Sequence, residues 1–201
     1  MKHKLLLTFL ASISVYAEAV PVRIDLAAED SFYSGPSVLA DNDCDWKLVT
    51  TNSSDIKVSG LPVKMELGGW KIGSVGYHKL SMYNDYRYTS EDTAFIQFSG
   101  LDQNSVYDIV IYAGRIYERK YKSVEMTLTR GYAKDKERLK TSPTQFDDFE
   151  ENGNYVRLKG IQSDKDGVIR FEFDGKKDYQ IVNAIEIEEI HEPSAILLTL
   201  K

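Results

Sequence analysis

Apolar and polar residues alternate along much of the chain, and this alternation is the clearest signal in the sequence. In the segment 62–67, Val63, Met65 and Leu67 alternate with charged residues. The same pattern occurs in residues 93–98, 123–129, 168–174 and 180–190. A period of two is typical of β-strands with one face toward the core and the other toward solvent. It places Phe95, Gln97, Arg170 and Glu172 on the solvent faces of their strands.

Further strands are predicted where the composition favours extended structure. These segments are 22–26, 47–50, 55–58, 106–113 and 155–158. The segment 106–113 is apolar on both faces apart from Asp108, as expected of a central strand. Turn pairs such as Ser99-Gly100 and Asp166-Gly167 separate the strands, and no segment has a sustained helical period. The fold class predicted is all-β, a two-sheet antiparallel jelly-roll-like β-sandwich.

Three long connections interrupt this pattern, and we interpret them as loops that carry function. They span residues 27–46, 68–92 and 131–154. Structureless connections of this length are uncommon in compact domains unless they carry function, and the alternative is that they lack a fixed structure.

The first 19 residues have the layout of a secretory signal peptide. Lys2 and Lys4 precede a mostly apolar run over residues 5–16, and the small-x-small sequence 17–19 follows. The run is shorter than the roughly 20 apolar residues of a membrane-spanning helix. We expect removal of residues 1–19, no stable membrane span in the mature chain, and export to the periplasm, the cell surface or the extracellular space. Residues 20–190 then form one domain.

The charge of the chain narrows the range of partners. The chain carries 25 basic and 31 acidic residues, which gives a net charge of −6. Removal of the signal peptide makes the net charge more negative by one. Because phosphate backbones are bound by clustered lysine and arginine, no nucleic-acid partner is expected. Cys44 is the single cysteine, so packing must hold the fold without an internal disulfide. The oligomeric state is left open by the sequence.

Several motifs, taken in order, resemble the galactose-binding-like domain of secreted bacterial proteins of the PEP-CTERM-associated type. The central block runs from Phe98-Ser99-Gly100-Leu101 to the sequence 107–115, Tyr-Asp-Ile-Val-Ile-Tyr-Ala-Gly-Arg. The opening sequence 22–26, Trp46, and the closing segments 166–169 and 182–187 complete it. The resemblance spans about residues 22–190 and implies a jelly-roll fold. It also allows a structural calcium ion.

The C-terminal segment 191–201 resembles a truncated PEP-CTERM signal. Glu192-Pro193-Ser194 matches its start, but His191 stands where a proline is expected and only five apolar residues follow. An ordinary chain end is the alternative interpretation.

The connection 68–92 supplies the first candidate for a ligand site. The predicted binding residues are Trp70, Tyr77, Tyr83, Tyr86 and Tyr88 of this connection, with Arg115 and Tyr117 after the central strand. Aromatic faces stack on sugar rings, while neighbouring polar groups bind the hydroxyls. We therefore expect these residues to bind a polysaccharide or glycan. Alternatively, Trp70 closes one end of the core and the tyrosines pack within the sandwich.

A second candidate site is a calcium loop at residues 41–45. Asp41, Asp43 and Asp45 stand at alternate positions, as carboxylate ligands of calcium do. The glycine and distal glutamate of an EF-hand are missing, so an Asp-rich turn is the alternative. No cofactor is required by anything in the sequence.

Catalytic machinery is not recognisable. The mature chain has two histidines, His78 and His191, and no Gly-x-Ser-x-Gly elbow. We therefore expect a non-catalytic carbohydrate-binding module that recognises an envelope or extracellular polysaccharide. The alternatives are a structural or adhesive matrix protein that binds protein partners and, third, a small glycoside hydrolase, since the chain has many carboxylates that could form a catalytic pair.

Overall fold

The computed structural model describes eleven segments of the chain. They are residues 20–26, 33–39, 46–74, 81–83, 85–90, 94–117, 120–122, 125–131, 138–141, 148–174 and 180–190. For residues 74, 81, 85, 115–117 and 120–122, the structure describes the backbone but not the side chain. The expected signal peptide, residues 1–19, and the tail 191–201 lie outside the described residues.

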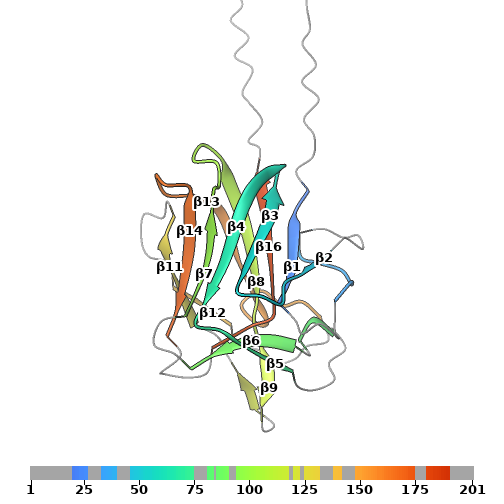
Figure 1. Cartoon of the computed structure of the whole chain (residues 1–201). Coiled ribbons are helices and arrows are strands. Elements are labelled where there is room, and N and C mark those ends of the chain that lie inside the picture. The colour runs from blue at the N-terminus through green and yellow to red at the C-terminus, as the bar shows by residue number, and fades with distance from the viewer. Residues whose placement is uncertain are drawn as a thin grey trace, which may run out of the picture.

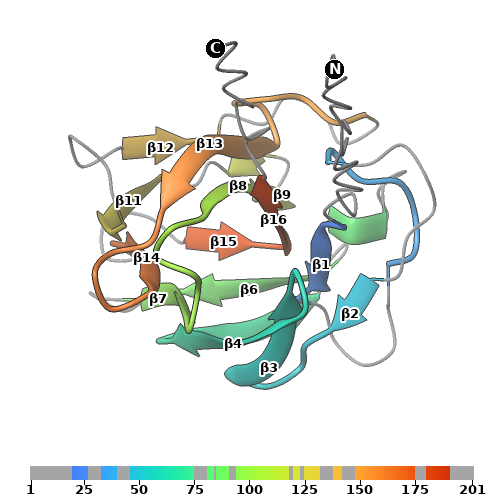
Figure 2. The same cartoon turned by 90° about the horizontal axis from the view of Figure 1, so that it is seen from above.

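Two antiparallel sheets form most of the molecule (Figures 1 and 2). The five-stranded sheet has the order β13 (Tyr155–Gln162), β8 (Val106–Tyr112), β16 (Ala184–Ile190), β1 (Val22–Asp25) and β2 (Trp46–Leu48). The six-stranded sheet has the order β12 (Arg138–Lys140), β11 (Glu125–Arg130), β14 (Val168–Phe173), β7 (Ala94–Ser99), β4 (Leu61–Gly68) and β3 (Ser53–Val58). Only the β1–β2 pair among these is parallel.

The core lies between the two sheets, as the alternation of apolar residues predicts. Ile109 and Ile185 of the five-stranded sheet are fully buried, as are Met65, Ile96 and Phe171 of the six-stranded sheet. Each belongs to the core-facing side of its strand, and on β4, β7 and β14 the intervening residues, mostly polar, point away from the core. The predicted all-β sandwich is confirmed.

Two smaller sheets and a short helical turn add to the sandwich. They comprise β15 (Gln180–Val182), β6 (Asp85–Thr89) and β5 (Lys71–Ser74) in one sheet, β9 (Arg115–Tyr117) and β10 (Lys120–Lys122) in the other, and the 3₁₀ turn η1 (Ser81–Tyr83). β5, β6 and β9 gather at the lower end in Figure 1. The prediction of a structureless connection over 68–92 is therefore wrong. In the described part of the chain, no helix is long and apolar enough to cross a membrane.

One predicted strand, 180–190, is divided at Asn183. The Asn183 side chain is fully buried, and its Oδ1 accepts a hydrogen bond of 3.0 Å from the backbone N–H of Gly114. Its backbone N–H donates to the Tyr112 carbonyl at 2.8 Å. Asn183 thus fixes the point where the chain passes from β15 to β16.

The outer faces of the two main sheets differ. Segments 33–39 and 148–155 contribute Tyr33 and Phe149, among others, to an aromatic cluster over one end of the five-stranded sheet. The outward side chains of the six-stranded sheet are exposed or half-buried, with the exception of Val168. The six-stranded sheet therefore presents its polar face to solvent.

Candidate functional site

Trp70 does not form part of an exposed binding surface. Its side chain is 5% exposed, and its Nε1 donates a hydrogen bond of 2.9 Å to the Phe95 carbonyl. The ring packs edge-on against Phe173, with 4.8 Å between ring centroids. Trp70 closes one end of the core, so the interpretation of Trp70 as a sugar-stacking residue is wrong.

Tyr83 and Tyr86 are also buried, with 0% and 4% exposure. The Tyr83 hydroxyl donates to the Asn154 carbonyl at 3.0 Å, and burial raises the pKa of Tyr83 well above its ordinary value. Tyr86 lies over Gly73, whose position would leave only 2.7 Å between an added Cβ and the Tyr86 ring. Both assignments as stacking residues are wrong, because these rings are enclosed by protein. Tyr88 is half-buried, and the centroid of its ring lies 5.9 Å from the centroid of the Tyr86 ring.

The other sequence-based site residues are not placed by the structure. The backbones of Arg115 and Tyr117 form β9, and their side chains are not described. Tyr77 and the proposed calcium ligands Asp41, Asp43 and Asp45 lie outside the described residues, as do Cys44 and His78. Within the described segments, no group of three or more His, Cys, Asp or Glu residues could hold a metal ion.

A cluster of polar side chains with an aromatic base occupies the centre of the outer face of the six-stranded sheet. Phe95 and Gln97 project from β7, and Arg170 and Glu172 project from the neighbouring strand β14. Gln97 lies directly opposite Arg170, and Phe95 lies opposite Glu172. We call these four residues the Arg170 platform.

Three contacts hold the Arg170 guanidinium over the sheet. Its Cζ lies 3.8 Å from the centre of the Phe95 ring, a cation–π arrangement. Nε lies 3.2 Å from Glu172 Oε1, and Nη1 lies 3.1 Å from Gln97 Oε1. No described residue accepts a hydrogen bond from the remaining terminal nitrogen, Nη2. The Arg170 side chain as a whole is 22% exposed.

Gly68 provides the space that the Phe95 ring occupies. The two residues are cross-strand partners on β4 and β7. A Cβ added to Gly68 would lie 2.0 Å from Phe95 Cε1, closer than any real contact. A glycine is therefore required at this position for Phe95 to lie across β4 and support Arg170 from below.

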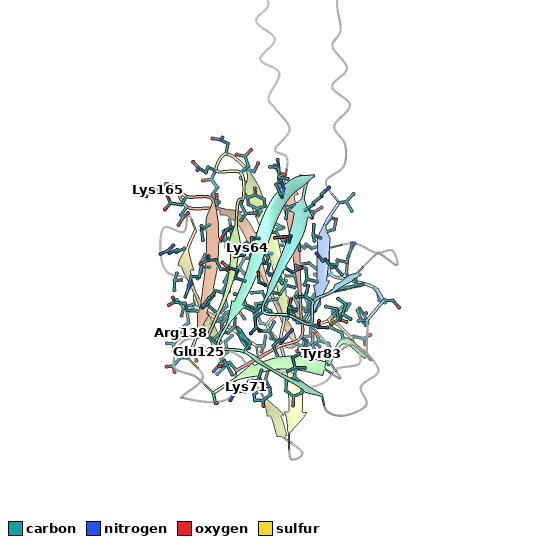
Figure 3. The ribbon with its side chains drawn as sticks, in the orientation of Figure 1. Lys64, Lys71, Tyr83, Glu125, Arg138 and Lys165 are labelled. Carbon is teal, nitrogen blue, oxygen red and sulfur yellow. The ribbon has the colours of Figure 1, made fainter. Side chains whose placement is uncertain are left out.

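Polar groups continue on both sides of the Arg170 platform. On β4, Lys64 and Glu66 form an ion pair of 2.7 Å, and Glu66 is the cross-strand partner of Gln97. Glu125 and Arg138 form another pair between β11 and β12. Figure 3 shows Lys64 midway along the six-stranded sheet and the Glu125–Arg138 pair nearer the end with β5 and β6. The face thus offers hydrogen-bond donors and acceptors over several adjacent strands.

The outer face of the five-stranded sheet carries a second charged cluster, which is buried. Arg23 and Glu186 are 2% and 0% exposed, and Arg23 Nε lies 3.6 Å from Glu186 Oε2. Glu186 accepts hydrogen bonds from the Tyr112 hydroxyl and from the backbone N–H groups of Val38, at 3.1 Å, and Leu39, at 3.3 Å. Burial and the Glu186 charge raise the pKa of Tyr112. These contacts fasten the segment 33–39 to the sheet, which is a structural role.

Asp108 and Glu188 are neighbouring carboxylates on this face, as cross-strand partners on β8 and β16. Asp108 is 7% exposed and is engaged by Arg157 Nη2 at 2.7 Å and by the Gly160 N–H at 3.0 Å. Burial, followed by the charge of Asp108, raises the pKa of Glu188, while Arg157 opposes this. A glycosidase needs two carboxylates that flank a bound sugar in a cleft. Asp108 is instead tied to the protein by both of its oxygens.

A surface hollow of about 350 Å³ lies elsewhere, between the edge strands β2 and β3. Val22, Lys47, Asp55, Ile56, Lys57 and Pro62 line it. Asp55 supplies the one carboxylate among these described lining residues, whereas acid–base glycoside hydrolysis uses a pair.

The Arg170 platform was not predicted as a site from the sequence. The alternation of apolar and polar residues in β7 and β14 places its four residues on the solvent faces of these strands. Only Phe95, an apolar residue at a solvent-facing position, distinguishes this face from an ordinary polar surface. Their proximity depends on the pairing of β7 with β14, which are separated by about seventy residues of sequence.

Comparison with known proteins identifies a shared fold. No protein-family model matches the chain, and no curated protein matches it. Among solved structures, a Bacteroides uniformis β-glucuronidase 2 aligns with a TM-score of 0.54 and 13% identity over 86% of this chain. The alignment covers 18% of that enzyme's chain.

Two further structures align less well. The CBM22-1 xylan-binding domain of Paenibacillus barcinonensis Xyn10C has a TM-score of 0.33 and 14% identity over 72% of this chain and 89% of its own. The exo-β-1,3-galactanase of Phanerochaete chrysosporium has a TM-score of 0.35 and 13% identity over 68% of this chain and 29% of its own. The chain is thus similar in fold to a small part of a longer bacterial enzyme chain, consistent with the jelly-roll sandwich that the sequence resemblance implies.

Proposed function

We propose that this protein is an exported, non-catalytic carbohydrate-binding module that holds a polysaccharide on the outer face of its six-stranded sheet. The Arg170 platform carries this proposal. Arg170 is fixed in one orientation by Phe95, Gln97 and Glu172, and its Nη2 points to no acceptor among the described residues. Pre-organised donors of this kind raise affinity because little side-chain entropy is lost on binding.

The chemistry of the face suits a sugar chain. Adjacent sugar hydroxyls are both donors and acceptors, and guanidinium, carboxylate and carboxamide groups can each bind a pair of them. The face supplies all three types, from Arg170, Glu66 and Gln97. Because the face is open along the strands, a polymer could cross it without an end having to enter a cleft.

Two observations favour binding over hydrolysis. The described residues that line the hollow between β2 and β3 include one carboxylate, and Asp108 of the Asp108–Glu188 pair is held by Arg157 and Gly160. The fold shared with part of a β-glucuronidase agrees with a role in carbohydrate biology, although a fold hosts many functions.

The test is binding of the purified protein to a panel of immobilised polysaccharides, with Arg170→Gln beside the wild type. Lys165→Gln is the matched control, because Lys165 is 89% exposed in the turn before β14 at the opposite end of the sheet from Glu125 and Arg138 (Figure 3). The proposal predicts binding that Arg170→Gln loses and Lys165→Gln keeps. Absence of binding across the panel, or release of reducing sugars from a bound polymer, would contradict it; capture of a matrix protein by the same face would support the adhesive alternative.

A further inference from the structure

We infer that the bound polysaccharide is acidic, with carboxylate groups that the arginines of the six-stranded sheet recognise. This inference rests on the proposed function, since it specifies the ligand of the same face. The observation behind it is the position of a second arginine. Arg130 of β11 is the cross-strand partner of Arg170 of β14.

Two arginines opposite one another repel, and like charges in this position destabilise a sheet. Arg130 is exposed, and it has no hydrogen bond or ion pair with any described residue. The pairing lies at an irregularity of β11 between Leu128 and Arg130, where the register shifts. Bulges of this kind redirect side chains and often occur beside binding sites. An anion between Arg130 and Arg170 would relieve the repulsion.

The geometry of Arg170 favours a carboxylate as that anion. Its Nε and Nη1 are engaged by Glu172 and Gln97, which leaves Nη2 without an acceptor among the described residues. Hydrogen bonds between a guanidinium and a carboxylate are short and about twice as strong as neutral ones. The Phe95 ring beneath Arg170 keeps the guanidinium plane in place while such a bond forms.

The charge of the whole face agrees with an acidic ligand. Its outward side chains include six basic residues, Lys57, Lys64, Arg130, Arg138, Lys140 and Arg170, and four acidic ones, Asp55, Glu66, Glu125 and Glu172. The balance is positive on a chain whose net charge is −6. The outer face of the five-stranded sheet has the opposite balance, with Arg23 and Arg157 against Asp25, Asp108, Glu186 and Glu188. Of the two outer faces, the described part of the six-stranded sheet is therefore the more favourable for a polyanion.

The interleaved carboxylates distinguish this ligand from a nucleic acid. A phosphate backbone carries a charge at every unit and is bound by clusters of basic residues without acidic neighbours. Lys64, Arg138 and Arg170 each have a glutamate partner on the face. A chain with spaced carboxylates and many hydroxyls matches this mixed surface better.

The experiment compares polygalacturonate with the same polymer after methyl esterification, which removes the charge and keeps the sugar. Affinities of the purified protein are measured by affinity electrophoresis and calorimetry at low and high salt. We expect binding of polygalacturonate to be about tenfold or more tighter than binding of the ester, as loss of one charged hydrogen bond implies. Arg130→Gln should abolish most of this difference, whereas Lys165→Gln should leave it unchanged.

The outcomes separate this inference from the proposed function. Equal affinity for polygalacturonate and its ester, or binding of neutral polysaccharides only, overturns the acidic ligand and leaves the carbohydrate-binding function standing. Binding to none of these polymers overturns both. Single-stranded DNA that competes as well as polygalacturonate, or an equal loss in Arg130→Gln and Lys165→Gln, would show unspecific charge attraction and overturn the inference. Arg130 is exposed at the end of β11, so Arg130→Gln should fold, and circular dichroism checks this.

Discussion

The guanidinium of Arg170 lies 3.8 Å above the Phe95 ring on the outer face of the six-stranded sheet. Phe95 itself lies across Gly68, so a stack of three residues from β4, β7 and β14 supports the guanidinium. The stack explains why a phenylalanine is tolerated on a polar face: the ring is half-buried by its neighbours and serves as the base of the Arg170 platform.

The Gly68–Phe95 contact can be tested by adding one methyl group. Gly68→Ala places a Cβ where Phe95 Cε1 lies, so the ring must move and Arg170 loses its support. We expect a destabilisation of about 1–3 kcal/mol, typical of overpacking, together with weaker polysaccharide binding. Urea unfolding and affinity electrophoresis measure the two effects.

The control is Phe95→Leu in the Gly68→Ala background. Leucine leaves room for the new methyl group, so stability should return toward that of Phe95→Leu alone while binding stays weak. Independent, additive losses from Gly68→Ala and Phe95→Leu would contradict the contact.

The fold was predictable from the sequence because its main strands have one apolar and one polar face. Met65, Ile96 and Phe171 alternate with polar residues, and each lies in the core where the period places it. Register and strand order are long-range properties, so the meeting of Phe95 with Arg170 could not be read from either strand.

The burial of the aromatic residues in 68–92 was not predictable for a different reason. In β6, Tyr86 alternates with Arg87, which suggests one wet face. Arg87 is in fact 2% exposed, and its Nη2 donates to the carbonyls of Val49, at 3.0 Å, and Thr51, at 3.4 Å. Burial lowers the pKa of Arg87. Both faces of β6 are therefore covered by protein. Because one of the buried residues is an arginine, the alternation of apolar and polar residues in β6 wrongly indicates a solvent-exposed face.

Trp70 should affect stability and leave ligand binding intact. Trp70→Ala removes a large side chain that packs against Phe173, and we expect a loss of about 3–5 kcal/mol. Trp70→Phe should lose less. Polysaccharide affinity of the folded fraction, measured at low temperature, should equal that of the wild type. A folded Trp70→Phe protein without binding would restore the earlier assignment of Trp70 to the site.

The buried Arg23–Glu186 pair should behave as one structural unit. Glu186→Leu removes the acceptor for Val38 and Leu39 and leaves Arg23 as an uncompensated buried charge, so we expect a loss of about 3–5 kcal/mol. The double variant Arg23→Met, Glu186→Leu removes both charges and should be more stable than Glu186→Leu. Urea unfolding of the wild type and these two variants tests this; a double variant less stable than Glu186→Leu would contradict it.

Glu188 should make the stability of the protein depend on pH. Its pKa is raised by burial and by Asp108, so the folded state holds the Glu188 proton to a higher pH than the unfolded chain does. As the pH rises from about 4.3, the ordinary glutamate pKa, through the higher folded value, this group lowers the stability of the folded state. Glu188→Gln should therefore be more stable than the wild type at pH 7, and the difference should shrink toward pH 4.

Urea midpoints across this pH range measure the effect of Glu188. Asp108→Asn in the same series should reduce the difference, because the Asp108 charge contributes to the raised pKa of Glu188. If the stability difference between Glu188→Gln and the wild type widened on acidification, the raised pKa of Glu188 would be contradicted.

The most direct test is a map of the ligand contact surface by NMR. The ¹⁵N-labelled protein is titrated with galacturonate oligomers, and backbone amide shifts are followed residue by residue. We expect the largest changes at Gln97 of β7, Arg130 of β11 and Arg170 of β14, with small changes at Trp70, Tyr83 and Tyr86. Changes centred on β5 and β6, or on the outer face of the five-stranded sheet, would show that the Arg170 platform is not the binding site.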